Sequence, residues 1–395
     1  MSNIIIPRTL GVSRFVGANT LTEVIPQILA QGLMALRSAC VMPSLVNSDY
    51  AMDARKKGNT VDVPIPSAVA TKDVAPGPTA PTDDDTIPTS AQIPLDQWKE
   101  APFYLTDKDL MEAMAGTIPM QASEAIKSLA NTVNAFIFSK YKGVYGLAGS
   151  PGTTPFATDT SEATEARKIL NLQLAPLDDM RRFAMDPDAE ANALNLRAFQ
   201  DTNFAVTAAD VREGRMTRKL GFNWAMDQQV PTHTSTPLTA GTASVNGAHA
   251  AGVSTVSIAK ATNTSPLVAG DIITFAGFTQ TYAVTADTTL IVGNTDVPIT
   301  PPLQAPLAGG EVVSLTASHV VNLAFHRDAF AFASRPLEDL MANELGSVVQ
   351  AATDPVSGMT LRLEVTRQHK QIRWSYDMLY GAALVRGALA TRVAG

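Results

Sequence analysis

The side chains best suited to acid–base or metal chemistry in this 395-residue chain are five histidines and one cysteine. They are His233, His249, His319, His326, His369 and Cys40. No histidine has a further histidine, cysteine or carboxylate three or four residues away, the spacing typical of a local ligand set. We therefore expect the histidines to be surface or strand residues. Cys40 has no local activating group beyond Arg37, which predicts a small buried apolar residue and not a nucleophile.

Motifs for phosphate binding and nucleophilic catalysis are missing from the sequence. It contains no P-loop, no G-x-G-x-x-G, no G-x-S-x-G and no H-E-x-x-H. The run Gly149–Gly152 lacks the elbow spacing and indicates a turn. Asp83–Asp85 are consecutive carboxylates that point in different directions, which favours a solvated loop tip over a metal site. The sequence thus predicts no catalytic residues, no metal and no cofactor, and a protein that is not an enzyme.

Composition favours a large folded protein without a dedicated nucleic-acid reading face. Hydrophobic residues make up 45% and charged residues 17%, the net charge is −7, and lysines and arginines are scattered. A protein that merely encloses nucleic acid needs no such face. Residues 1–7 lack the pattern of a signal peptide, and no apolar run approaches the roughly 18 residues of a membrane span. We expect a soluble protein made in the cytoplasm, with no membrane partner.

Two helices stand out by their apolar periodicity. The first covers about residues 22–39, with Thr22 as N-cap and Pro26 in the first turn. The second covers about 119–141 and is the strongest helix of the chain, with one apolar stripe and a polar face. Its length of about 30 Å suits either a core helix or a structural spine.

Two alternating runs flank a segment rich in proline, glycine and aspartate. The runs are 58–66 and 93–104, and the segment between them includes Ala75–Pro81. Prolines are excluded from central strands, so this pattern predicts a long hairpin that projects from the body.

Composition changes sharply between residues 229 and 318. This stretch has five charged residues and no arginine, and it is rich in threonine, valine, alanine, glycine and serine. Short strands are expected at 253–258, 271–275, 282–285, 290–292 and 312–315, which indicates a small all-β module. Mixed α/β sequence lies on both sides: helices at 163–174 and 188–199 precede it, and a helix at 337–343 and alternating strands after 359 follow it. The module is therefore predicted to be an insertion at an exposed loop.

Several stretches together resemble one protein family. They are Val41–Tyr50, Lys56–Val61, Val63–Pro64, Leu170–Asn171, Ala175–Pro176, Arg181–Arg182, Arg212–Gly214, Gly221–Phe222, Val230–Thr234, Leu267–Gly277, Arg373–Asp377 and Tyr380–Gly381. In order and spacing they resemble the coat proteins of tailed bacteriophages with the Hong Kong 97-type capsid fold. In particular, they look like the branch typified by the Salmonella podophage coat protein, which carries an extra β-barrel domain.

The resemblance implies an α+β capsid fold with a defined layout. An N-terminal arm would span 1–50, an extended E-loop hairpin 51–105, and a peripheral domain with the spine helix 106–160. Axial and peripheral segments would occupy 161–228 and 319–395, with an inserted β-barrel domain at 229–318.

The same resemblance implies the function of a major capsid protein. Copies would assemble into hexamers and pentamers of an icosahedral shell around double-stranded DNA, in the virion, after assembly in the bacterial host cytoplasm. Scaffolding protein and portal are the implied assembly partners.

Shell function is spread over contact regions and not concentrated at a catalytic site. Interfaces of obligate assemblies are large and apolar, so loop and arm hydrophobes are the candidate contacts between subunits. These are Ile25, Leu29 and Leu33 in the arm and Val61, Val63, Ile65, Trp98 and Tyr104 along the loop. Each of them could equally belong to ordinary core within one chain.

Two other functions fit parts of the sequence. A cell-surface or tail-associated adhesin would use 229–318 as a carbohydrate-binding domain, and predicts a secretion signal or repeated β modules. A hydrolase with a β insertion predicts histidines and carboxylates that converge in a pocket.

Overall fold

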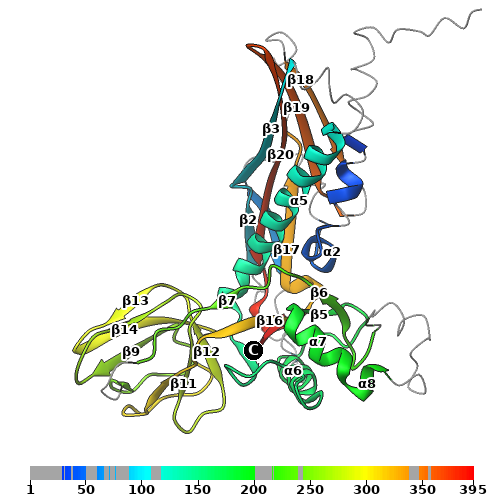
Figure 1. Cartoon of the computed structure of the whole chain (residues 1–395). Coiled ribbons are helices and arrows are strands. Elements are labelled where there is room, and N and C mark those ends of the chain that lie inside the picture. The colour runs from blue at the N-terminus through cyan, green and yellow to red at the C-terminus, as the bar shows by residue number, and fades with distance from the viewer. Residues whose placement is uncertain are drawn as a thin grey trace, which may run out of the picture.

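A computed structural model describes residues 29–30, 32–36, 39–49, 60–65, 71, 76, 89–107, 117–200, 216, 218–238, 243–337, 347–354 and 357–395. Figure 1 shows an elongated upper body of strands and one long helix, a lower unit of sheet and helices, and a β-rich lobe beside it. Helices and strands are thus mixed and partly segregated, as in an α+β protein.

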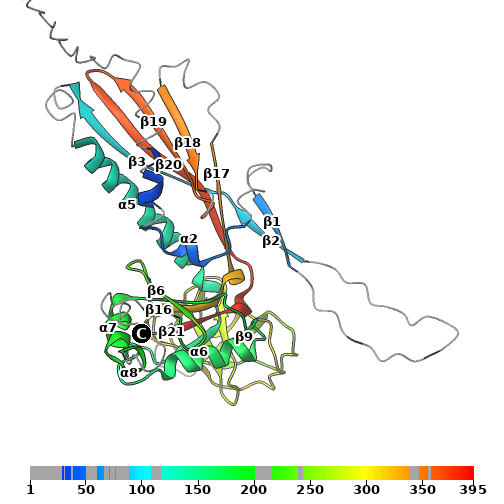
Figure 2. The same cartoon turned by 90° about the vertical axis from the view of Figure 1, so that its right-hand side faces the viewer.

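The upper body is an antiparallel sheet with one helix along its face. Its strands are β3 (Gln97–Thr106), β17 (Phe330–Arg335), β18 (Ser347–Thr353), β19 (Thr360–Gln368) and β20 (Gln371–Leu384). The order is β17-β20-β19-β18, and β3 pairs with β20 in the register Gln97↔Tyr380 to Thr106↔Gln371. Helix α5 (Thr117–Phe138) lies along this sheet in both views (Figures 1 and 2).

The apolar stripe of α5 packs against the sheet. Ile126, Leu129, Val133 and Ile137 are buried in one core with residues of β19 and β20. The predicted stripe is therefore correct, with one exception on the face expected to be polar. Asn134 is buried, and its Oδ1 accepts a hydrogen bond of 3.2 Å from the backbone N–H of Met42. This contact ties the short helix α2 (Met42–Leu45) to the long helix.

The second alternating run of the sequence divides between two sheets, which corrects the predicted hairpin. Strand β1 (Thr60–Ile65) pairs with β2 (Thr89–Pro94), from Thr60↔Pro94 to Ile65↔Thr89. After the break at residues 95–96, β3 leaves this ribbon and joins the upper body. The ribbon β1–β2 stands out to one side of the body in Figure 2. The residues between β1 and β2 lie almost entirely outside the described part, as does Asp83–Asp85.

The lower unit is a mixed sheet of β4 (Gly146–Gly149), β21 (Ala390–Ala394), β16 (His319–His326), β5 (Arg181–Met185) and β6 (Asn223–Met226), in that order. The short strand β7 (Thr232–His233) also pairs with β16. The helices of this unit are α6 (Ser161–Leu172), α7 (Pro187–Asn195) and α8 (Arg197–Gln200). Residues 319–395 therefore contribute to both the upper body and the lower unit.

The lobe consists of strands between residues 243 and 315. They are β8 (Ala243–Val245), β9 (Thr255–Lys260), β10 (Ser265–Leu267), β11 (Ile272–Phe275), β12 (Thr281–Val284), β13 (Thr288–Leu290), β14 (Gly293–Thr300) and β15 (Val313–Leu315). Six of them form a sheet in the order β15-β11-β12-β14-β9-β8. Its two edge strands meet, because Ser244 bridges to Val312 and Val245 N–H donates to the Glu311 carbonyl.

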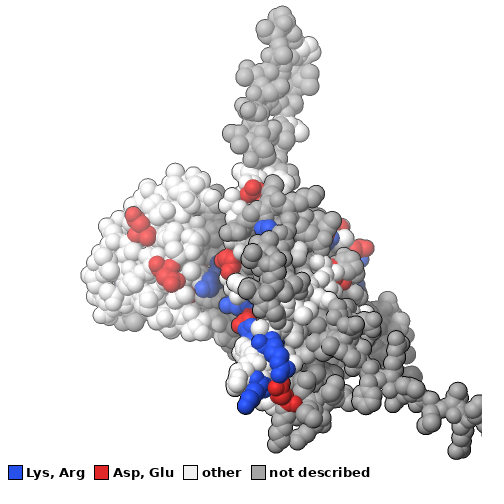
Figure 3. Space-filling model, turned by 90° about the horizontal axis from the view of Figure 1, so that it is seen from above, with Lys and Arg blue, Asp and Glu red and all other residues white. Residues whose placement is uncertain are grey.

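The lobe has its own hydrophobic core, and the chain enters and leaves it at one place. Val256, Ile258, Phe275 and Val297 are among the buried residues of that core. Strand β7 precedes the lobe in the chain and strand β16 follows it. These two strands pair with each other, with His233 opposite His319. Figure 3 shows mostly uncharged surface on this lobe, with isolated acidic residues, as the composition of this stretch predicts.

The predicted terminal helix is described only in part. Residues 29–30, 32–36 and 39 are helical, whereas 1–28 lie outside the described residues. The predicted helix at 337–343 falls almost wholly outside them as well. Among the residues that the structure does describe, no helix is long and apolar enough to cross a membrane.

Candidate functional site

Two of the five histidines, His233 and His319, lie in one buried cluster between the lobe and the rest of the molecule. His233 Nδ1 lies 2.9 Å from the Tyr141 hydroxyl, and His233 Nε2 lies 2.9 Å from Asp271 Oδ1. Tyr141 comes from the 3₁₀ turn η2 (Ser139–Gly143), and Asp271 precedes β11 of the lobe. The search for local ligand spacing missed this pair, because its partners are distant in the sequence.

A buried arginine completes this cluster. Arg392 of β21 is fully buried, donates to the carbonyls of Gly270 (2.6 Å) and Lys142 (3.3 Å), and lies 4.9 Å from the centre of the Tyr141 ring. Burial lowers the pKa of Arg392 to about 10 and raises that of Tyr141. Burial likewise lowers the pKa of neighbouring His319 to about 4. These groups are closed off from solvent, and their hydrogen bonds join the lobe to η2 and β21.

Cys40 is buried, as expected from the sequence. Burial, with a smaller contribution from Asp227, raises the pKa of its thiol to about 12, so the reactive thiolate is scarce at neutral pH. In the part of the chain that the structure covers, no group of three or more histidines, cysteines and carboxylates could hold a metal ion.

The loop residues predicted from the sequence as contacts between subunits differ in exposure. Val61 and Val63 are buried against Ile93, Ala331 and Ala333, so they serve as core within one chain. Ile65 is half-buried at the end of β1.

Trp98 and Tyr104 lie on β3 and are 62% and 52% exposed. Trp98 donates its indole N–H to Asp377 at 2.8 Å, and Asp377 also accepts from Arg362 Nε at 2.8 Å. These contacts hold the Trp98 ring in place on the outer surface of the sheet, where it remains open to a partner.

Of the three arm residues, the two that the structure describes pack against the core of the upper body. Leu29 is buried in the same core as α5, and Leu33 is half-buried against it. Ile25 lies outside the described residues.

Three leucines not singled out from the sequence are among the most exposed apolar side chains. Leu172, Leu174 and Leu177 are 73%, 88% and 74% exposed, and they follow one another where α6 ends and the chain turns toward β5. In the sequence, leucines alternate with other residues from 170 to 174 and give no sign of exposure. The predicted helix at 163–174 includes Leu172 and Leu174, so only Leu177 lay past the expected helix end.

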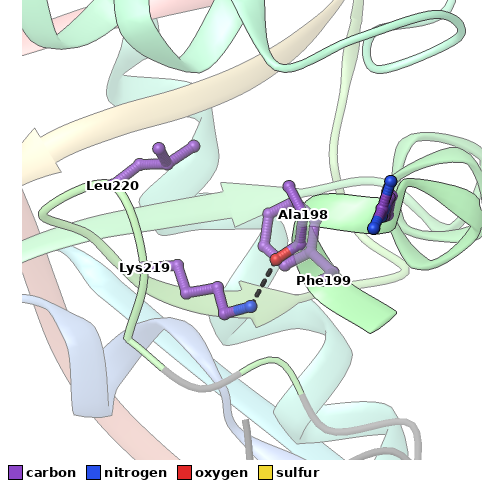
Figure 4. A pocket seen from close by; sticks show the side chains of 5 residues that line it. Ala198, Phe199, Lys219 and Leu220 are labelled. Carbon is purple, nitrogen blue, oxygen red and sulfur yellow. Dashed lines mark hydrogen bonds between the residues drawn. The ribbon is translucent and has the colours of Figure 1, made fainter. Parts of the chain in front are cut away.

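A cavity of about 540 Å³ lies on the same lower unit. It is lined by Arg197, Ala198, Phe199, Lys219 and Leu220. Lys219 reaches across to the carbonyl oxygen of Ala198, as Figure 4 shows. The walls combine apolar surface with two cationic side chains, without a histidine or a carboxylate among these five residues.

Comparison with known proteins gives a fold likeness and no sequence match. No protein-family model matches the chain, and no curated protein matches its sequence. Solved structures that it resembles include Mycobacterium phage Che8, at 15% identity over 90% of both chains with a TM-score of 0.50. They also include the capsid of cyanophage P-SCSP1u, at 12% identity over 90% and 88% with a TM-score of 0.49. The capsid of a native GTA particle matches at 10% identity over 90% of both chains with a TM-score of 0.45. The chain shares the overall fold of the Mycobacterium phage Che8 structure.

Proposed function

We propose that this chain is the major capsid protein of a tailed bacteriophage, of the Hong Kong 97-type fold. Copies of it would assemble into an icosahedral shell that encloses double-stranded DNA without reading its sequence. The observation that carries the proposal is the fold shared with the Mycobacterium phage Che8 structure over 90% of both chains. The role would be structural, in accord with the burial of His233, His319 and Asp271 at the point where the lobe is attached.

The layout of the elements supports an assignment of domains within that fold. Helix α5 and the sheet of β3, β18, β19 and β20 would be the spine and peripheral domain, and the ribbon β1–β2 the base of the E-loop. The lower unit would be the axial domain. The closed sheet between residues 243 and 315, entered and left through the paired strands β7 and β16, would be the inserted β-barrel domain.

Contacts between copies would use the residues that face outward. Trp98 and Tyr104 are our candidates on the sheet, with Ile65 at the end of β1. An exposed aromatic residue that is already oriented by hydrogen bonds, as Trp98 is by Asp377, loses little side-chain freedom when a partner covers it. Scaffolding protein and portal would be the partners during assembly.

Sedimentation and electron microscopy of the purified full chain, alone and with a scaffolding protein of the same phage, test the proposal. We expect closed shells, tubes or capsomer rings. A chain that stays monomeric at every concentration, salt condition and scaffold ratio would overturn it. Carbohydrate binding by the lobe of such a monomer would instead support an adhesin.

A further inference from the structure

The loop between α6 and β5 displays apolar surface that the rest of the chain does not cover. It carries Leu172, Leu174 and Leu177, each more than 70% exposed within six residues. Single exposed leucines are common on protein surfaces, but neighbouring ones form a patch of the kind found at interfaces.

The backbone at Leu174 adopts a conformation that leucine disfavours. Helix α6 ends in a Schellman motif, in which Ala175 N–H donates to Leu170 C=O and Leu174 N–H donates to Asn171 C=O. The residue at the left-handed position of this motif is usually glycine, and here it is Leu174, with φ of 59°. Its side chain, 88% exposed, gains little packing within the chain to offset that strain. Strain of this kind is often retained where it serves function.

A buried arginine holds the loop rigid. Arg181 is almost fully buried, and its guanidinium donates to the carbonyl oxygens of Pro176 (2.8 Å) and Ala175 (2.7 Å) and to Asn171 Oδ1 (2.8 Å). The far end of the loop is also fixed, because Asn223 Nδ2 donates to the Asp179 carbonyl at 2.9 Å. The three leucines are therefore presented in a fixed arrangement, which lowers the entropy cost of binding.

The same chain carries a matching apolar cavity. Phe199, Leu220 and Ala198 line the space of about 540 Å³ on the lower unit, with Arg197 and Lys219 beside them. The leucine loop ends in Asp178 and Asp179, which pair within the chain with His326 and Arg218, so the leucines are what the loop offers to a partner. A projecting apolar loop and an apolar cavity on one molecule allow a head-to-tail contact between copies, and such contacts form a ring where the rotation between copies closes.

We propose that the leucine loop 172–177 of one copy inserts into the Phe199–Leu220 cavity of the next copy in a capsomer ring. This inference rests on the proposed capsid function and names one of the contacts that would build the shell. The occupant is a second copy of this chain, because the chain itself supplies both apolar surfaces.

The first test uses substitutions that separate assembly from folding. Leu174→Gly relieves the left-handed backbone and removes the side chain, so the Tm of the unassembled subunit should equal or exceed that of the wild type. Leu177→Ser removes exposed apolar area only. Both should raise the concentration needed for assembly at least tenfold, as measured by sedimentation, whereas the control Val292→Ser, an exposed residue of the lobe, should leave it unchanged.

The second test identifies what the loop touches. The thiol of Cys40 is buried, so it can be kept in both variants, and wild-type chain oxidised in the same way is the control for crosslinks through Cys40. Leu174→Cys and Ala198→Cys chains are prepared separately, mixed, assembled and oxidised. We expect a disulfide between the two variants in the assembled fraction and none in the unassembled fraction.

The outcomes distinguish this contact from the proposed function. Wild-type chain that forms no shell, tube or ring would overturn the capsid function and this contact together. Normal assembly of both leucine variants would overturn the contact alone. Crosslinks only between identical Leu174→Cys chains would replace the head-to-tail contact by a symmetric one and refute insertion into the cavity.

Discussion

His233 and Asp271 lie 38 residues apart in the chain and approach to 2.9 Å in a fully buried pair. One precedes the lobe and the other belongs to it, so the hydrogen bond fixes the lobe at its point of attachment. Asp271 also accepts a hydrogen bond from Val268 N–H at 2.7 Å, and Tyr141 holds the other side of the His233 ring. Tyr141, His233, Asp271 and Val268 thus form a continuous chain of hydrogen bonds at the junction.

Removal of the Asp271 carboxylate should destabilise the protein strongly. Asp271→Ala leaves His233 Nε2 and Val268 N–H buried without partners, and we expect a loss of about 2–4 kcal/mol in the free energy of unfolding. Urea denaturation measures this change, and limited proteolysis reports whether residues flanking the lobe become accessible. The control is Asp296→Ala on the exposed side of β14, with an expected effect under about 0.5 kcal/mol. Equal effects of the two substitutions would contradict the role of the junction.

His319 should make stability fall on acidification. Burial lowers its pKa from 6.5 to about 4, so between these values the unfolded chain takes up a proton that the folded chain refuses. The contribution of neutral His319 to the free energy of unfolding is fully present above pH 6.5 and is lost as the pH falls to about 4. The total loss is roughly 3 kcal/mol at most.

His319→Asn tests that assignment, because asparagine cannot titrate and can still donate to the Ala317 carbonyl in place of Nδ1. Urea denaturation at several pH values from 7 to 4.5 gives the free energy of unfolding as a function of pH. Its slope should correspond to about one proton fewer taken up on unfolding in the variant than in the wild type. Parallel curves would show that His319 titrates alike in both states.

Trp98 and Val63 should respond to truncation in opposite ways. Trp98→Ala removes a largely exposed ring, so the subunit should lose no more than about 1 kcal/mol, while assembly weakens at least tenfold if the ring lies in a contact. Val63→Ala opens a cavity in the core shared with Ala331 and should cost about 1–3 kcal/mol of subunit stability. Thermal unfolding of the subunit and light scattering during assembly separate the two effects. Unimpaired assembly of both Trp98→Ala and Tyr104→Ala would remove β3 from the contact surface.

Replacement of Arg181 by lysine, although it keeps the charge, should destabilise the protein. Lysine cannot reproduce the fork that reaches two carbonyls and Asn171, so Arg181→Lys should cost about 2–4 kcal/mol and loosen the leucine loop. Hydrogen exchange at residues 171–177 and urea denaturation measure both effects. Arg182→Lys is the matched control, because the guanidinium of Arg182 bonds one backbone carbonyl, that of Asp179 at 3.2 Å, and otherwise contacts Met180 Sδ at 3.9 Å. Loop protection that survives Arg181→Lys would show that Arg181 is not what holds the loop.

The sequence by itself determined the elements whose side chains repeat regularly. The stripe on α5 and the strands β9, β11, β12, β13 and β15 of the lobe follow from local periodicity, since the helix and the strand each impose their own spacing on apolar residues. Strands β8, β10 and β14 were not predicted. The low charge of residues 229–318 likewise anticipated the uncharged surface of that lobe.

Tertiary structure decided which distant segments meet. Pairing of β3 with β20 brings Gln97 opposite Tyr380, and the departure of β3 from β2 divides a run that looked like one strand. The partnership of His233 with Asp271 and the burial of Asn134 depend on such pairings in the same way. The exposure of Leu174 likewise depends on how distant segments pack around α6. Local sterics fix helix and strand, but burial and long-range hydrogen bonds depend on a register that no short stretch of sequence contains.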